Sequence, residues 1–106
     1  MENGKEKESK VVVKLFVLKQ YDDVNPILNA LREGYTVAVI DIKTLRQKDP
    51  IELKRAVSKI KKTCDAIEGK IAGFGENTVI VTPAFATIKK EEEKVQKEPK
   101  DKFDYY

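Results

Sequence analysis

Five cationic side chains cluster in the middle of the chain and are the residues best suited to binding a charged partner. The apolar residues between them recur every three or four positions. On a helix this spacing gathers the apolar side chains on one side and leaves the cations on the other. Ammonium and guanidinium groups bind carboxylates and phosphates. The five residues are Lys54, Arg55, Lys59, Lys61 and Lys62.

The residue types that usually carry catalysis are absent or do not have the required spacing. The chain has no histidine, which excludes Ser-His-Asp catalysis, histidine-assisted cysteine catalysis and the usual zinc sites. Cys64 lies on the apolar side of the helix, so we expect a core residue. Gly69, Gly73 and Gly75 follow a helix, whereas a phosphate loop follows a strand and opens a helix. We therefore predict a protein that is not an enzyme and uses no cofactor or metal.

Length and composition predict one domain between two charged ends. Of the 106 residues, 37% are charged, and the net charge is +3. Residues 1–10 and 89–106 are too charged to join a core, so we expect both to be disordered and residues 11–88 to form the domain. A core this small is marginal alone, which favours oligomerisation. A single cysteine and the lack of a signal peptide or long apolar run predict a cytoplasmic protein.

The first half of the domain predicts a strand, a helix and a second strand. Residues 11–18 are almost continuously apolar, which is typical of a strand covered on both faces or pairing at a subunit contact, and we expect the central strand here. A short helix then begins at Asp22 or Asp23 and ends at Gly34. Residues 35–42 predict a strand parallel to the first.

The cationic residues lie on a second, longer helix. Asp49 is its N-cap, Pro50 takes its first position, and Glu52 completes a variant of the capping box. Gly69 ends it. Its buried side consists of Leu53, Ala56, Val57, Ile60, Cys64 and Ile67.

The end of the domain predicts a hairpin. Residues 71–74 and 78–81 are short apolar runs, and residues 75–77 between them readily accept positive φ. Residues 84–88 are a candidate for a last edge strand. At the end of the second strand, Asp41 is expected to be a structural carboxylate that turns the loop into residues 43–48.

These elements predict a compact α/β fold. The order is βαβαββ, which gives a two-layer sandwich with a mixed sheet and both helices available to cover one face.

Several segments in this order resemble the SepF cell-division proteins, particularly the archaeal SepF-like branch. They are an EG-type turn into an apolar strand, a long helix, the segment GKIAGFGE and a strand that ends in TP. The resemblance spans residues 11–88. It implies a compact α/β sandwich that forms tight homodimers, which can assemble into polymers or rings. It also implies a noncatalytic adaptor that binds the C-terminal peptide of FtsZ, the tubulin-like division GTPase, and tethers or bridges FtsZ filaments at the division site on the inner membrane face.

By position, the resemblance implies a peptide pocket around the second helix and the hairpin. We expect Ile71 and Phe74 to bury an apolar anchor of the peptide while lysines pair with its acidic or terminal groups. The expected peptide contacts are Lys54, Lys61, Lys62, Ile71, Phe74 and Val79. The expected dimer or polymer contacts are Val11, Val13, Gly69 and Gly73.

Two questions stay open from the sequence. Family members begin with an amphipathic membrane-targeting helix, whereas residues 1–10 have no apolar face, so the route to the membrane is open. The alternative function is an Alba-like dimeric nucleic-acid-binding protein, with the same lysines on phosphates. The small charge excess and the lack of interleaved aromatic residues disfavour nucleic acid as the partner. A purely self-assembling scaffold is a third possibility.

Overall fold

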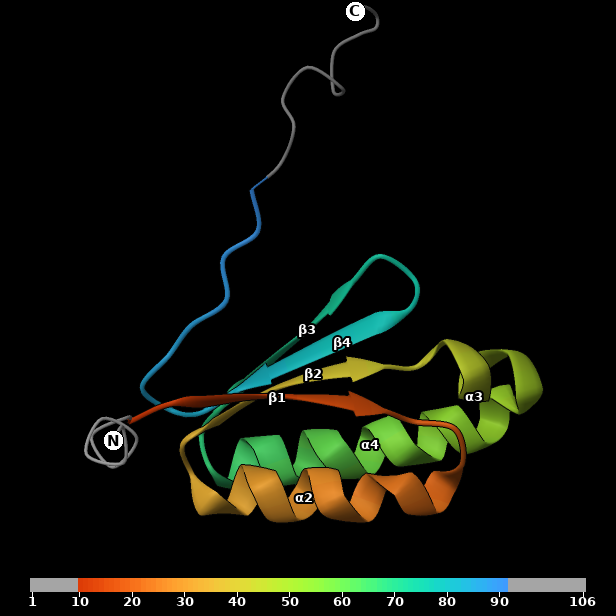
Figure 1. The fold of residues 1–106 in the computed structure, drawn as a ribbon, viewed down its shortest axis with the longest axis horizontal. Coiled ribbons are helices and arrows are strands. Elements are labelled where there is room, and N and C mark those ends of the chain that lie inside the picture. The colour runs from red at the N-terminus through yellow and green to blue at the C-terminus, as the bar shows by residue number, and fades with distance from the viewer. Residues whose placement is uncertain (1–9, 92–106) are drawn as a thin grey trace, which may run out of the picture.

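A computed structural model describes residues 10–91 and shows one mixed sheet with helices against one of its faces (Figure 1). The strands lie in the order β1-β2-β4-β3; β1 and β2 are parallel, and the other pairs are antiparallel. The predicted two-layer α/β sandwich is confirmed. The elements are β1 (Val12–Val17), the 3-10 helix η1 (Tyr21–Asp23), α2 (Val24–Glu33), β2 (Thr36–Asp41), α3 (Lys43–Lys48), α4 (Pro50–Ala66), β3 (Lys70–Phe74) and β4 (Thr78–Thr82).

Helix α4 begins as its sequence predicts. The Asp49 carboxylate accepts a hydrogen bond from the backbone N–H of Glu52 at 3.1 Å, and Pro50 takes the first helical position. The capping box does not close, because the Glu52 carboxylate pairs with Arg55 and the Asp49 N–H donates to the carbonyl of Leu45. The predicted apolar stripe is confirmed: Ala56, Ile60 and Cys64 are fully buried, and Leu53 and Ile67 pack beside them.

Helix α2 lies beside α4 beneath the sheet (Figure 1). Ile27, Leu28 and Leu31 are buried in the same core, and Gly34, with φ 89°, ends the helix in the left-handed region. Asp23 takes the expected N-cap position, but its side chain accepts no hydrogen bond from the helix. The Asp23 carboxylate instead accepts from the backbone N–H groups of residues 19 and 20, so it stabilises the turn before the helix.

The expected position of the first strand is wrong, because β1 lies at an edge of the sheet and β2 and β4 occupy its centre. One face of β1 is also open. The side chains of Val13 and Leu15 are 61% and 78% exposed, whereas Phe16 packs against the core. The apolar run of this strand therefore reflects one face covered by the helices and a second face that nothing in the described chain covers.

Two further segments differ from expectation. Residues 84–88 form no strand, because the chain turns directly after β4: the N–H of Ala86 donates to the carbonyl of Pro83 at 3.1 Å. Residues 43–48 form the short helix α3, with Leu45 buried beneath it. Asp41 has the expected structural role, since its carboxylate accepts from the N–H of Lys43 at 2.9 Å.

The exit from α4 uses a glycine for space and not for a left-handed conformation. The helix ends at Ala66, and Glu68 is the residue with positive φ, at 61°. A Cβ on Gly69 would lie 2.2 Å from the carbonyl oxygen of Thr82. Gly69 is therefore required because β4 passes directly over it, and no side chain fits there.

Candidate functional site

The pleat of strand β3 separates Ile71 from Phe74, which we expected in one pocket. Successive side chains of a strand point to opposite faces. Ile71 and Gly73 face α4, and Ile71 packs against the core. Ala72 and Phe74 belong to the other face, and Phe74 is 64% exposed. The structure therefore does not bring Ile71 and Phe74 together around one ligand.

A groove of about 310 Å³ lies between α4 and β3. It brings together three of the predicted peptide contacts, Lys61, Ile71 and Val79. Gly73, which we expected at a subunit contact, also lines it. Val57, which we expected only on the buried side of the helix, is half-buried and forms part of the groove wall. The lining residues are Val57, Lys61, Ile71, Ala72, Gly73 and Val79.

The groove is bordered by an edge strand. Within residues 10–91, β3 pairs only with β4, so its other side has no strand partner. Such an edge presents backbone N–H and C=O groups that can pair with another chain. A Cβ built on Gly73 would come no closer than 3.9 Å to another residue, so the face of the strand that borders the groove has room for a ligand side chain at this position. The site thus combines an apolar wall, a lysine and an accessible backbone.

The lysines of α4 divide between two sides of the helix. Lys54 and Lys61 are seven residues apart and lie on the same side as the groove. Lys62 lies about 100° further around the helix. It lines a different hollow, together with Tyr21, Arg55, Ser58 and Lys59. Lys62 therefore does not contribute to the α4–β3 groove.

The second hollow is organised by an aromatic ring. The guanidinium carbon of Arg55 lies 4.4 Å from the ring centroid of Tyr21, and Nζ of Lys59 lies 5.9 Å from it, both within cation–π range. Arg55 also donates to the Glu52 carboxylate at 2.8 Å. This hydrogen bond, followed by the charge of Glu52, raises the pKa of the Arg55 guanidinium.

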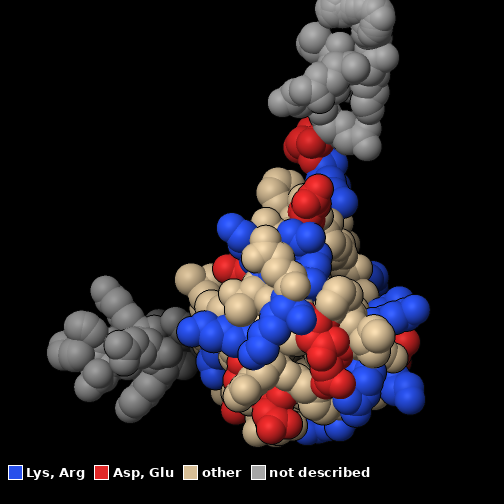
Figure 2. Space-filling view, turned by 90° about the vertical axis from the view of Figure 1, so that its right-hand side faces the viewer, with Lys and Arg blue, Asp and Glu red and all other residues tan. Residues whose placement is uncertain are grey.

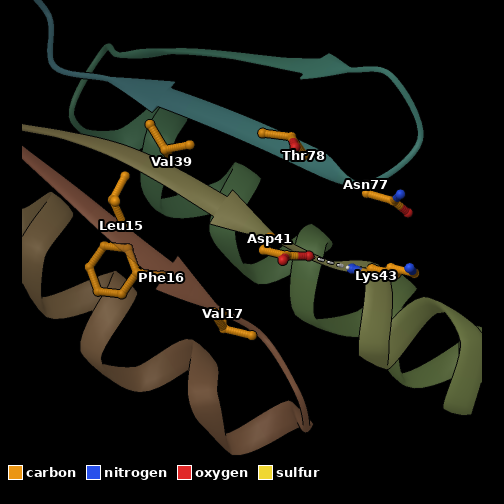
Figure 3. Close-up of a pocket in the computed structure, with 8 residues that line it drawn as sticks. All are labelled: Leu15, Phe16, Val17, Val39, Asp41, Lys43, Asn77 and Thr78. Atoms are coloured by element: carbon orange, nitrogen blue, oxygen red, sulfur yellow. Dashed lines mark hydrogen bonds between the residues drawn. The ribbon is translucent and has the colours of Figure 1, made fainter.

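The sheet face turned away from the helices is the third feature. Leu15, Val39, Ile80 and Ala72 are successive cross-strand partners, so an apolar row crosses all four strands. Figure 3 shows Leu15 and Val39 on this face and Phe16 on the side of the helices. A hollow of about 390 Å³ lies at one end of the face, where Asp41, Lys43, Asn77 and Thr78 add polar groups. We call this surface the open face; its apolar residues are Val13, Leu15, Val17, Val37, Val39, Ala72, Phe74 and Ile80. At its β3 end, residues 88–91 line a hollow together with Ala72, Phe74 and Ile80.

The four expected dimer contacts do not lie on one surface. Val13 lies on the open face, and Val11 is 43% exposed just before β1. Gly69 lies against the carbonyl oxygen of Thr82, and Gly73 lines the groove. Leu15 and Val17 are exposed on the same face as Val13. The alternation of residues 12–17 carried that signal, because it places Val13, Leu15 and Val17 on a single face.

Residues that could support catalysis or metal binding are few. Cys64 is buried in the core as expected, and burial raises the pKa of its thiol, with a further increase from the charge of Asp65. Among the described residues, no group of His, Cys, Asp or Glu is arranged to hold a metal ion. None of the helices in residues 10–91 is long and apolar enough to cross a membrane.

The surface charge of the described chain is mixed. Figure 2 shows Lys and Arg interspersed with Asp and Glu on the side of the molecule that carries α3. The cations of α4 are split between two sides of the helix and form no continuous track for a phosphate backbone. This arrangement argues against the Alba-like alternative.

Comparison with known proteins places this fold. The family model described as cell division protein SepF matches residues 13–88, which include the groove, the cationic hollow and the open face. The chain belongs to the SepF family. A comparison with curated proteins gives no match.

Solved structures of archaeal SepF proteins share the fold. A SepF-like protein from Archaeoglobus fulgidus is 23% identical, with a TM-score of 0.71, and the match covers 78% of this chain and 98% of that chain. A SepF-like protein from Pyrococcus furiosus is 24% identical, with a TM-score of 0.67 and coverage of 76% and 96%. Cell division protein SepF from Methanobrevibacter smithii, solved in complex with FtsZ-CTD, is 20% identical, with a TM-score of 0.66 and coverage of 76% and 99%.

Proposed function

We propose that this SepF-family protein is a noncatalytic cell-division adaptor that binds the C-terminal peptide of FtsZ in the groove between α4 and β3. The observation that carries the proposal is the combination of an apolar wall, a rim lysine and an unpaired strand edge at one place. The complex of the Methanobrevibacter smithii relative with FtsZ-CTD supports the choice of partner.

The geometry suggests how an extended peptide is held. The peptide adds to the free edge of β3 as a further strand, so that main-chain hydrogen bonds supply affinity. One apolar side chain of the peptide packs against Val57, Ile71 and Val79. Lys61 and Lys54 pair with carboxylates of the peptide at the solvent-exposed rim. These pairs are screened by salt, so added salt weakens binding without abolishing it.

A second copy of the chain covers the open face in this proposal. The apolar row through Leu15, Val39 and Ile80 crosses the whole sheet, and apolar surfaces of this extent mark interaction sites in small proteins. Two copies related by a two-fold axis bury the same surface on each partner. The grooves lie on the helix side of β3, so both stay accessible in the dimer.

Two grooves per dimer allow bridging of filaments. An FtsZ filament presents many C-terminal peptides, so a second peptide binds at a high effective concentration once the first is held. Weak single contacts then produce strong attachment, and the protein gathers filaments at the division site on the inner membrane face. Assembly of the dimers into polymers stays a prediction.

Gly73→Lys tests the groove directly. A lysine at this position points into the groove and fills it, while the space around Gly73 allows the fold to persist. We expect the affinity for a fluorescent FtsZ C-terminal peptide, measured by anisotropy, to fall at least about tenfold, a loss of about 1.4 kcal/mol. Thr87→Lys adds the same charge outside the groove and is the control.

Full-length FtsZ provides a second readout. FtsZ that lacks its C-terminal peptide should no longer be retained by the immobilised protein. Undiminished retention, or wild-type peptide affinity in Gly73→Lys, contradicts the proposal.

A further inference from the structure

The hollow around Tyr21 is separate from the peptide groove and has its own chemistry. We call it the cationic cradle; it has a volume of about 260 Å³ and is lined by Tyr21, Arg55, Ser58, Lys59 and Lys62. Three of these five residues are cations, and none is a carboxylate. A cavity of this size admits a small polar group and is below the range of drug-sized ligands.

The cradle retains positive charge despite nearby acids. Glu52 accepts from one N–H of Arg55, at 2.8 Å, which leaves the other donors of the guanidinium free for a ligand. Glu52 and Asp22 line a neighbouring hollow that shares Tyr21 with the cradle, and Asp65 lies three residues beyond Lys62. Lys59 and Lys62 have no ion-pair partner among the described residues.

Tyr21 and Glu52 reduce the freedom of the cations. The ring of Tyr21 packs partly against the core, and both Arg55 and Lys59 lie over it. Cation–π contacts and the Glu52 hydrogen bond hold the guanidinium in place before any ligand arrives. A group that is already oriented loses less entropy on binding. This distinguishes the cradle from Lys43 and Lys48 of α3, which lie over no aromatic ring in the described part of the chain.

We propose that the cationic cradle binds a single phosphate group, either on the headgroup of an anionic phospholipid or as free phosphate. Phosphate oxygens accept hydrogen bonds from the arginine fork, the two ammonium groups and the Ser58 hydroxyl. A nucleic-acid backbone is not the favoured ligand, because it needs cations that continue from one phosphate to the next. The inference goes beyond peptide binding.

The two sites are arranged for simultaneous occupancy. The cradle lies on the side of α4 that faces Tyr21, whereas the peptide groove lies on the side that faces β3. A protein that holds a lipid headgroup at the cradle therefore keeps its groove free for a peptide.

Two charge-matched double variants test the cradle. Lys59→Glu/Lys62→Glu reverses two of its cations, and Lys43→Glu/Lys48→Glu makes the same charge change in α3. All four side chains are exposed, and circular dichroism verifies that both variants fold. The probes are inorganic phosphate, titrated by NMR, and vesicles of phosphatidylcholine alone or with an equal part of phosphatidylglycerol, tested by co-sedimentation.

The wild type should bind phosphate, and the cradle variant should bind at least about tenfold more weakly, whereas the α3 variant should bind within about twofold of the wild type. Additional binding to the phosphatidylglycerol vesicles assigns the ligand to a lipid headgroup; binding of phosphate alone assigns it to free phosphate. The inference is overturned if the wild type binds neither probe, if both variants lose binding equally, or if a DNA duplex binds more tightly than either probe. The FtsZ peptide affinity of the cradle variant should equal that of the wild type. The phosphate site and the peptide groove are therefore tested independently of each other.

Discussion

The two faces of the sheet have the same apolar character but different surroundings. On the helix side, Ile40 is fully buried beneath α2 and α4. On the open face, Leu15 of the neighbouring strand is 78% exposed, although it continues an apolar row across the sheet. An apolar strand therefore indicates that both of its faces are covered by some partner. It does not indicate whether that partner is a helix of the same chain or another molecule. The chain's own helices cover one face, and we propose a second copy for the other.

The largest effect is expected on the covered face. Ile40→Ala removes a fully buried side chain and leaves a cavity, so the free energy of unfolding should fall by about 2–5 kcal/mol. Denaturant unfolding followed by circular dichroism measures it. A loss as small as that of an exposed substitution would mean that this face is not the main core.

A substitution on the open face should change the oligomeric state of the protein. Leu15→Glu places a carboxylate in the middle of the proposed interface, and an unpaired buried charge is strongly unfavourable. We expect light scattering after size-exclusion chromatography to show the monomer mass at concentrations where the wild type is a dimer.

Gln47→Glu is the matched control, because it adds the same charge on α3, away from the open face. A Leu15→Glu protein that remains dimeric would show that the subunits associate through another surface.

Gly69 and Gly73 should respond differently to the same substitution. Gly69→Ala forces a Cβ against the Thr82 carbonyl and should cost about 1–3 kcal/mol of stability, whereas Gly73→Ala has room and should change it by less than about 0.5 kcal/mol. Thermal unfolding of the two variants measures the difference. Equal effects would contradict the distinction between a closed contact at Gly69 and an open groove at Gly73.

The N-cap of α4 should contribute less to stability than the close contact at Gly69. Asp49→Ala removes the hydrogen bond to the Glu52 N–H and should lower the stability by about 1 kcal/mol. Asp49→Ser should recover most of that loss, because a hydroxyl oxygen can accept the same bond. The dimer mass should not change in either variant, since α4 lies on the covered face.

Local signals predicted much of the fold. The three- and four-residue spacing through Ala56, Ile60 and Cys64 predicted the buried side of α4, and Asp49 with Pro50 predicted where that helix begins. Gly34 marked the end of α2. The parallel pairing of the first two strands followed from the helix between them.

The position of β1 could not be read from its own residues. Its apolar run is compatible with a central strand or with an edge strand that binds another molecule, and only the pairing of β2 with β4 decides between them. Helix α3 has six residues and one buried side chain, Leu45, which is too little for a periodic pattern. Strand order and short helices depend on tertiary contacts that local patterns do not contain.

Part of the candidate site can be predicted from the sequence. A spacing of three residues on a strand places Ile71 and Phe74 on opposite faces, so they could have been assigned to different surfaces from the start. The division of Lys61 and Lys62 follows from the helical angle in the same way. The groove itself was not predictable, because it depends on how closely α4 packs against the edge strand β3.

Amide chemical-shift mapping with the FtsZ C-terminal peptide tests most directly that the two sheet faces have separate partners. We expect the largest shifts along β3 and at the groove residues Val57, Lys61 and Val79, while Val13, Leu15 and Val39 of the open face shift little. Largest shifts on the open face, or shifts confined to the cationic cradle, would contradict it.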